Sequence, residues 1–140
     1  MDPKQPPPAD NSDDSKPVVL VVDDDRSHRK LFELLSRRLD ITAHMTESCD
    51  EALESLDLFA FDIILMDCRM PGTDGFVCTQ KIRTLFETTR HIPIIAVTGQ
   101  TEKGMRQRCL NAGMDDYLGK PFTLEELHEK LALWLPQKEV

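Results

Sequence analysis

The sequence predicts an α/β fold in which a five-stranded parallel sheet carries helices on both faces. Short apolar runs alternate five times with segments whose apolar residues recur every three or four positions, which is typical of repeated βα units. Three of the runs are continuously apolar, as strands covered on both faces are. A chain of 140 residues makes one ordinary domain with a single core.

Five strand-helix pairs account for the chain from residue 17 to residue 136. The runs VVLVV, ITAHM, IILM, IPIIAV and DYLG predict the strands. Each is followed by apolar positions at helical spacing, and we expect these stripes to face the core. The stripe positions, in chain order, are Leu31, Leu34, Leu35 and Leu39; Cys49, Ala52, Leu53 and Leu56; Cys78, Ile82 and Leu85; Met105, Cys109 and Ala112; and Leu124, Leu127, Leu131 and Leu135.

The strand order can be predicted from which apolar runs have the pattern or length of edge strands. In the second run Ile41, Ala43 and Met45 alternate with polar residues, which is typical of an edge strand, and the fifth run is short. Right-handed crossovers then favour the strand order 2-1-3-4-5, the flavodoxin-like arrangement of a doubly wound sheet.

The segments before and after the five strand-helix pairs are predicted to be tails. The cysteines indicate the redox compartment of the chain. Residues 1 to 16 hold four of the nine prolines and no branched apolar residue, which predicts a disordered Pro-rich tail or linker, and residues 137 to 140 form a short C-terminal tail. The four cysteines form no C-x-x-C pair, and no secretory leader or membrane-spanning run is present. We therefore expect reduced thiols and a cytoplasmic location, on the cytoplasmic side if the chain is part of a membrane sensor.

The net charge and the spacing of the histidines indicate which macromolecules and metal ions the chain is not expected to bind. With 25 acidic against 17 basic residues the net charge is −8, so we expect no direct contact with nucleic acid. No apolar run is long enough to cross a bilayer, so we expect no membrane contact by this chain. We also expect a monomer. A zinc site is not expected, because the histidines lack metal-ligand spacing. They are His28, His44, His91 and His128.

Polar residues follow four of the predicted strands. Asp23 and Asp24 end the first and Asp67 the third, while Thr98 ends the fourth and Lys120 follows the fifth. The carboxyl ends of parallel strands meet at one edge, beside the point where the strand order reverses. Three crowded carboxylates call for a divalent cation, and magnesium suits oxygen ligands. Asp67, alone at a central strand end, is the better-placed nucleophile, and Lys120 and Thr98 suit phosphoryl transfer.

These motifs, in this order and spacing, resemble the receiver (response-regulator) domain of two-component phosphorelays over residues 17 to 136. They are VLVVDDD, LMDCRMPGTDG, PIIAVTG and GMDDYLGKPF. The resemblance implies that Asp67 accepts a phosphoryl group. It also implies a magnesium ion held by Asp24, Asp67 and the backbone carbonyl of Arg69, with Asp23 acting through water.

The resemblance further implies a switch and a set of partners. Thr98 would hydrogen-bond the phosphoryl group, Lys120 would pair with it before a cis peptide at Pro121, and Tyr117 would pack inward when Thr98 moves. The alternative for Tyr117 is plain packing at the edge of the sheet. The sequence is most similar to receivers of hybrid sensor histidine kinases. This similarity implies a histidine kinase or a histidine-phosphotransfer domain as partner. The partner's histidine has to reach Asp67, so we expect it to dock on the first helix and near Phe122.

Some positions depart from the family pattern or have an ordinary structural explanation. Gly99 and Gln100 after the switch threonine and Arg69 after the acceptor flank the phosphoryl position, so we expect them to set the phosphate lifetime. Cys68 should point away from Asp67 into the core.

Three other functions remain open on sequence. A phosphatase of the haloacid-dehalogenase type would use the D-x-D spacing of Asp23 and Asp25, although Asp67 would then lack a role. A pseudo-receiver would keep the fold without phosphorylation. A flavin carrier would need a phosphate-binding loop after the first strand, where DDDRSH stands instead. The receiver reading predicts a chain that catalyses only its own phosphorylation and slow dephosphorylation.

Overall fold

The structure is a computed structural model that describes residues 16–86, 91–99 and 103–135. Residues 1–15 of the tail expected at residues 1–16, the tail expected at residues 137–140, and Gln100 lie outside the described residues. Strands and helices alternate from start to end. They are β1 (Val18–Val22), α1 (Arg26–Arg38), β2 (Thr42–Thr46), α2 (Cys49–Leu58), β3 (Ile63–Asp67), α3 (Gly75–Phe86), β4 (Ile94–Thr98), α4 (Met105–Asn111), β5 (Asp116–Gly119) and α5 (Leu124–Trp134).

The predicted sheet is confirmed in strand order and direction. The order is β2-β1-β3-β4-β5, and every neighbouring pair is parallel. The register aligns the strand ends, since Val22 pairs with Thr46 and Met66, and Thr98 pairs with Gly119. The residues that follow these ends therefore share one edge of the sheet, beside the point between β1 and β3 where the order reverses.

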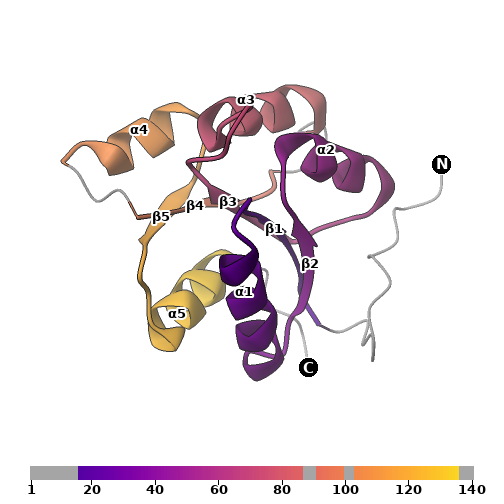
Figure 1. Cartoon of the computed structure of the whole chain (residues 1–140), viewed down its shortest axis with the longest axis vertical. Helices are drawn as coiled ribbons and strands as arrows, with labels where there is room; N and C mark the ends of the chain where they lie inside the picture. The colour runs from indigo at the N-terminus through magenta and orange to yellow at the C-terminus, as the bar shows by residue number, and fades with distance from the viewer. Residues whose placement is uncertain (1–15, 87–90, 100–102, 136–140) are drawn as a thin grey trace.

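Two layers of helices cover the sheet. Helices α2, α3 and α4 lie on one side and α1 and α5 on the other (Figure 1), and each side has its own cluster of buried apolar residues. The central strands β1, β3 and β4 are buried along their whole length, whereas β2 is mostly half-buried, as an edge strand is. Within the described ranges, no helix has the length and apolar character needed to cross a bilayer.

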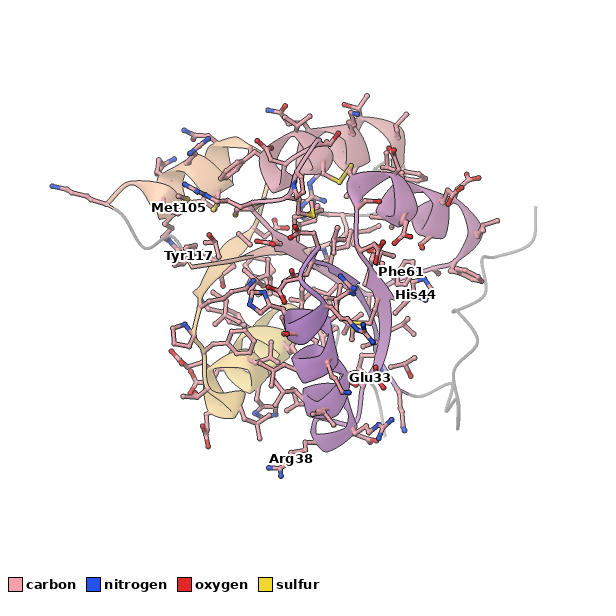
Figure 2. The ribbon with its side chains drawn as sticks, viewed as in Figure 1. Glu33, Arg38, His44, Phe61, Met105 and Tyr117 are labelled. Carbon is pink, nitrogen blue, oxygen red and sulfur yellow. A yellow bond between two sulfur atoms is a disulfide. The ribbon has the colours of Figure 1, made fainter. Side chains whose placement is uncertain are left out.

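The expectation of four reduced thiols was wrong for two of them. Cys49 at the start of α2 and Cys78 in α3 form a disulfide, with 5.6 Å between their Cα atoms, and it is visible between the two helices in Figure 2. Neither the spacing of the cysteines in the sequence nor the compartment indicates which of them the fold brings together. The fold places α2 and α3 on the same face, and this proximity joins cysteines that are 29 positions apart. Cys68 and Cys109 are free and buried.

The prediction that every apolar stripe faces the core was also wrong in part. On α1 the buried side is formed by Phe32 and Ser36 with Leu35 and Leu39 packed nearby. Two other stripe positions on α1 are exposed, at fractions of 45% and 54%; they are Leu31 and Leu34. They lie roughly 90° and 150° around the helix from the centre of that buried side. Leu85 of α3 is likewise exposed.

Candidate functional site

Three carboxylates meet at the carboxyl edge of the sheet. Asp23 and Asp24 follow β1 directly, and Asp67 ends β3. One oxygen of each lies within 4.8 Å of one oxygen of each of the others. Asp23 and Asp67 are buried, whereas Asp24 is exposed, so the cluster opens to solvent on one side. The structure thus brings together the acids that the sequence placed at one edge.

Asp23 is fixed by more contacts than its neighbours. Its carboxylate accepts from the backbone N–H of Asp25 at 2.9 Å and from the Lys120 ammonium at 3.0 Å. Its backbone carbonyl accepts from the Arg29 guanidinium at 2.8 Å. A buried carboxylate needs such donors to remain charged. Asp23 therefore has little freedom to turn toward a ligand directly.

The charged form of Asp67 is disfavoured in this site. The pKa of Asp67 is raised to about 6, first by burial and then by the charges of Asp23 and Asp24, while Lys120 and the backbone N–H of Arg69 act in the opposite direction. A divalent cation would relieve both the burial and the like-charge repulsion. The donor set, which is all oxygen and anionic, fits magnesium.

Lys120 supplies the positive charge of the site. Its Nζ lies 4.0 Å from Oδ1 of Asp67, which is an ion pair but too long for a hydrogen bond. The backbone N–H of Lys120 donates to the carbonyl of Thr98 at 2.8 Å, which ties the loop after β5 to the end of β4. The peptide bond between Lys120 and Pro121 is cis.

Thr98 and Cys68 lie on the side of the site that faces the core. Both are buried, and side-chain hydrogen bonds link Cys68 to Cys109 and to Thr98. Burial raises the pKa of the Cys68 thiol far above its usual value, so it remains a thiol. Cys68 belongs to the core cluster under α2, α3 and α4, as expected from its alternation with Asp67.

The loop after Asp67 closes tightly, and Gly75 is the reason it can. The N–H of Gly75 donates to the carbonyl of Cys68 at 3.1 Å, which brings the start of α3 back against the end of β3. A Cβ on Gly75 would clash with the carbonyl oxygen of Asp67 and with Cα of Cys68. The close approach therefore requires glycine and holds the backbone around Arg69 beside the acids.

Tyr117 lies away from the acids, on β5. It is half-buried and packs against the core cluster that contains Met105 and Cys109, at the edge of the sheet beneath α4 (Figure 2). Burial is the main cause that raises the pKa of its phenol. The structure therefore places Tyr117 where it contacts α4, but the side chain does not line the site in this state.

The site opens into a cleft of about 1030 Å³. Arg69 and Gly99, the flanking positions noted in the sequence, both line it. Leu31, Phe32 and Phe122 also line it, and the rings of Phe32 and Phe122 are 5.5 Å apart. The cleft thus joins a charged floor to an apolar rim on α1.

His28 also lines the cleft, and sequence reasoning missed it. Metal-ligand spacing does not single out this histidine, and His28 does not follow a strand end. Its position on the first turn of α1, four residues after Asp24, was the available signal, because one helical turn returns a side chain toward the helix start.

The phosphatase alternative depends on Asp25, whose carboxylate caps the start of α1. Asp25 is the N-cap of α1, and it accepts from the backbone N–H groups of Ser27 and His28. The acids that cluster are Asp23, Asp24 and Asp67. The D-x-D spacing of the phosphatase alternative therefore corresponds to one site residue and one helix cap.

Sequence comparison places this chain among known proteins. A sequence model described as the response regulator receiver domain matches residues 19–132. Signal transduction histidine-protein kinase BarA of Escherichia coli (strain K12) is 35% identical over 114 residues, which is 81% of this chain and 12% of the kinase. Hybrid signal transduction histidine kinase E of Dictyostelium discoideum is 38% identical over 80% of this chain and 7% of the kinase. The chain thus spans only a small part of these relatives.

Solved structures agree with the sequence match. The receiver domain of sensor histidine kinase PA1611 from Pseudomonas aeruginosa PAO1, which has a magnesium ion coordinated in its active site cleft, matches with a TM-score of 0.77 and 38% identity over 85% of this chain and 97% of that one. The receiver domain of Ssk1 from Saccharomyces cerevisiae, crystallised with the histidine phosphotransfer protein Ypd1, matches with a TM-score of 0.78 and 25% identity over 85% of this chain and 88% of that one. This chain belongs to the response regulator receiver domain family of two-component systems.

Proposed function

We propose that this domain accepts a phosphoryl group on Asp67 from a phosphohistidine and passes on a signal or the group itself. The observation that carries the proposal is the position of Asp67, a buried carboxylate at the end of a central strand with two more acids and one ammonium around it. That arrangement suits a nucleophile in phosphoryl transfer.

In the proposed reaction, an oxygen of Asp67 forms a bond to phosphorus while the bond from phosphorus to the donor's histidine nitrogen breaks. The histidine leaves with the electron pair of that bond. The product is an acyl phosphate, and water later attacks its phosphorus, which breaks the bond to the Asp67 oxygen, returns the carboxylate and releases inorganic phosphate. The Lys120 ammonium, 4.0 Å from Oδ1 of Asp67, would stabilise the phosphoryl oxygens as they gain negative charge. The domain thereby catalyses its own phosphorylation and its own slow dephosphorylation.

Magnesium is the cofactor that the acids fit. Asp24, Asp67 and the backbone carbonyl of Arg69 would hold the ion, with Asp23 acting through water. When bound, the ion neutralises charge on the phosphoryl oxygens. The raised pKa of Asp67 supports this, because burial first and the charges of Asp23 and Asp24 second disfavour its carboxylate, and a bound cation would offset both effects.

Thr98 and Tyr117 are the proposed switch. Thr98 would turn from Cys68 toward the phosphoryl group, and Tyr117 would move inward beneath α4. The contacts of Thr98 with Cys68 and of Tyr117 with the α4 side of the core support this coupling. Phosphorylation would thus alter the surface of α4, β5 and α5.

The proposed partner is a histidine kinase or a histidine-phosphotransfer domain, with this chain acting as a monomer on the cytoplasmic side and without nucleic acid. The partner's histidine must approach Asp67 through the cleft. The exposed Leu31 and Leu34 on α1 and the apolar rim at Phe122 support docking beside it. The Ypd1 complex of the Ssk1 receiver is one case of such a partnership.

Replacing Leu34 with Glu is expected to slow phosphotransfer from a phosphorylated histidine-phosphotransfer domain by about tenfold, because the change removes apolar contact area and adds a charge at the docking face. Rapid-quench measurement of transfer checks this. Leu85→Glu is the matched control, since Leu85 is similarly exposed but lies on α3 across the sheet. Equal rates for both variants would refute docking on α1.

The experiment that tests the function uses acetyl phosphate as donor. One phosphoryl group per chain is expected with magnesium, and none with EDTA, and the adduct should be released by hydroxylamine as acyl phosphates are. Continued release of many phosphates per chain from unrelated phosphate esters would support a phosphatase instead. No adduct in the presence of magnesium would leave a pseudo-receiver.

A further inference from the structure

His28 contacts the positive charge of the site. Its Nδ1 lies 2.8 Å from the Nζ of Lys120 and 3.3 Å from Oδ2 of Asp23. The side chain stands on the first turn of α1 and is 41% exposed, at the mouth of the cleft. None of the roles described above uses it.

The chemistry of the short contact fixes which atom donates. An ammonium group has three N–H donors and no acceptor, so at 2.8 Å Nδ1 of His28 must accept from Lys120. The ring proton then lies on Nε2, on the side of Asp25, whose Oδ2 is 3.8 Å away. This tautomer is inferred from the network of donors and acceptors. Nδ1 of His28 therefore accepts from Lys120 and does not donate to Asp23.

Lys120 is consequently held by two anchors. One N–H donates to Asp23 at 3.0 Å and a second to His28 at 2.8 Å. Asp67 lies 4.0 Å from the same nitrogen, beyond hydrogen-bond distance. Two directed bonds restrict the ammonium, whose side chain is otherwise long and flexible, and leave its third N–H for a group in the cleft.

We propose that His28 is a positioning residue for phosphoryl transfer, one that holds the Lys120 ammonium ready for the phosphoryl group on Asp67. The inference rests on the proposed function. Asp23 alone would be a weaker anchor, because it is also the acid proposed to face the magnesium ion through water. His28 is the anchor of Lys120 that is not shared in this way, and such prior placement of a cation is what makes it effective as charge develops.

His28→Leu is expected to slow phosphorylation by acetyl phosphate with magnesium about fivefold, the rate effect of one ordinary hydrogen bond. His28→Asn should restore the rate to within about twofold of wild type, because its amide oxygen is as many bonds from the backbone as Nδ1. Lys30→Leu, an exposed position on the same helix, is the control for changes to α1 and should leave the rate unchanged. Equal slowing by Leu and Asn would overturn the acceptor role.

A double-mutant cycle separates positioning from a merely structural effect. If His28 acts through Lys120, adding His28→Leu to Lys120→Met should slow phosphorylation no further. A full additional fivefold loss in that background would overturn the proposal. If wild type is phosphorylated and His28→Leu reacts at the same rate, the inference about His28 is overturned and the proposed function stands. If wild type takes no phosphoryl group, the proposed function is overturned as well.

Discussion

Asp67→Asn is expected to stabilise the magnesium-free domain by about 2 to 3 kcal/mol at about pH 7.5. Asp67 is 8% exposed, and its pKa is raised to about 6 by burial first and then by Asp23 and Asp24. At neutral pH the folded state therefore holds a charge that it disfavours relative to the unfolded chain. Asn keeps the shape and the acceptor for the N–H of Arg69 while it removes that charge.

The sign of the pH dependence follows from the raised pKa. The folded state binds a proton at Asp67 more tightly than the unfolded chain does, so the penalty is complete above about pH 6 and is relieved as the pH falls toward the ordinary value of 3.8. The advantage of the variant should thus shrink between these two values and vanish below them. Magnesium should oppose the effect, because it binds the charged form.

Urea unfolding in EDTA, at about pH 7.5 and again near pH 4, measures the difference. Asp57→Asn is the control, since Asp57 is an exposed acid on α2, and it should change the free energy of unfolding by less than about 0.5 kcal/mol. An Asp67→Asn variant that is no more stable than wild type at neutral pH would contradict the account of a strained acid cluster.

Lys120→Met is expected to lower the rate of phosphorylation about 100-fold, the usual effect of removing one charge-stabilising donor from an active site. Its Nζ is the ammonium 3.0 Å from Asp23 and 4.0 Å from Asp67, and Met keeps the length of the side chain without the charge. The same loss removes an attraction that lowers the pKa of Asp67, so the acid should be charged less often as well.

Lys130→Met is the matched control, because Lys130 also donates to a buried acid, Asp116, but on α5 away from the cleft. Rates with acetyl phosphate should differ less than about twofold between that variant and wild type. Circular dichroism of both variants checks that each is folded. A Lys120→Met rate close to wild type would show that another group stabilises the transferred phosphoryl.

The sequence predicted those site residues that follow strand ends. Asp23, Asp67, Thr98 and Lys120 are brought together because parallel strands of a doubly wound sheet end at one edge, and this can be argued from periodicity and order alone. The edge position of β2 followed in the same way from its alternation.

Features that depend on how the helices are rotated and packed against the sheet could not be predicted from periodicity and strand order. His28 reaches the site from α1, and the exposed side of Leu31 and Leu34 follows from the rotation of that helix against the sheet. The disulfide depends on the distance between α2 and α3, which no spacing in the sequence encodes.

The contacts of Asp116 likewise could not be predicted from the sequence pattern. It is buried on β5, where it accepts from Lys130 and the Trp134 indole of α5 and pairs with Arg106 of α4. Its partners lie on two separate helices, so only the packed structure reveals that one acid joins α4, β5 and α5.

The most direct test of the central claim is the intact mass of wild type and of Asp67→Asn after treatment with magnesium and acetyl phosphate. The account expects wild type to gain the mass of one phosphoryl group, which disappears on standing, and Asp67→Asn to gain none. An equal gain by Asp67→Asn would place the nucleophile at another residue, such as an acid after β1, and would contradict the assignment of Asp67.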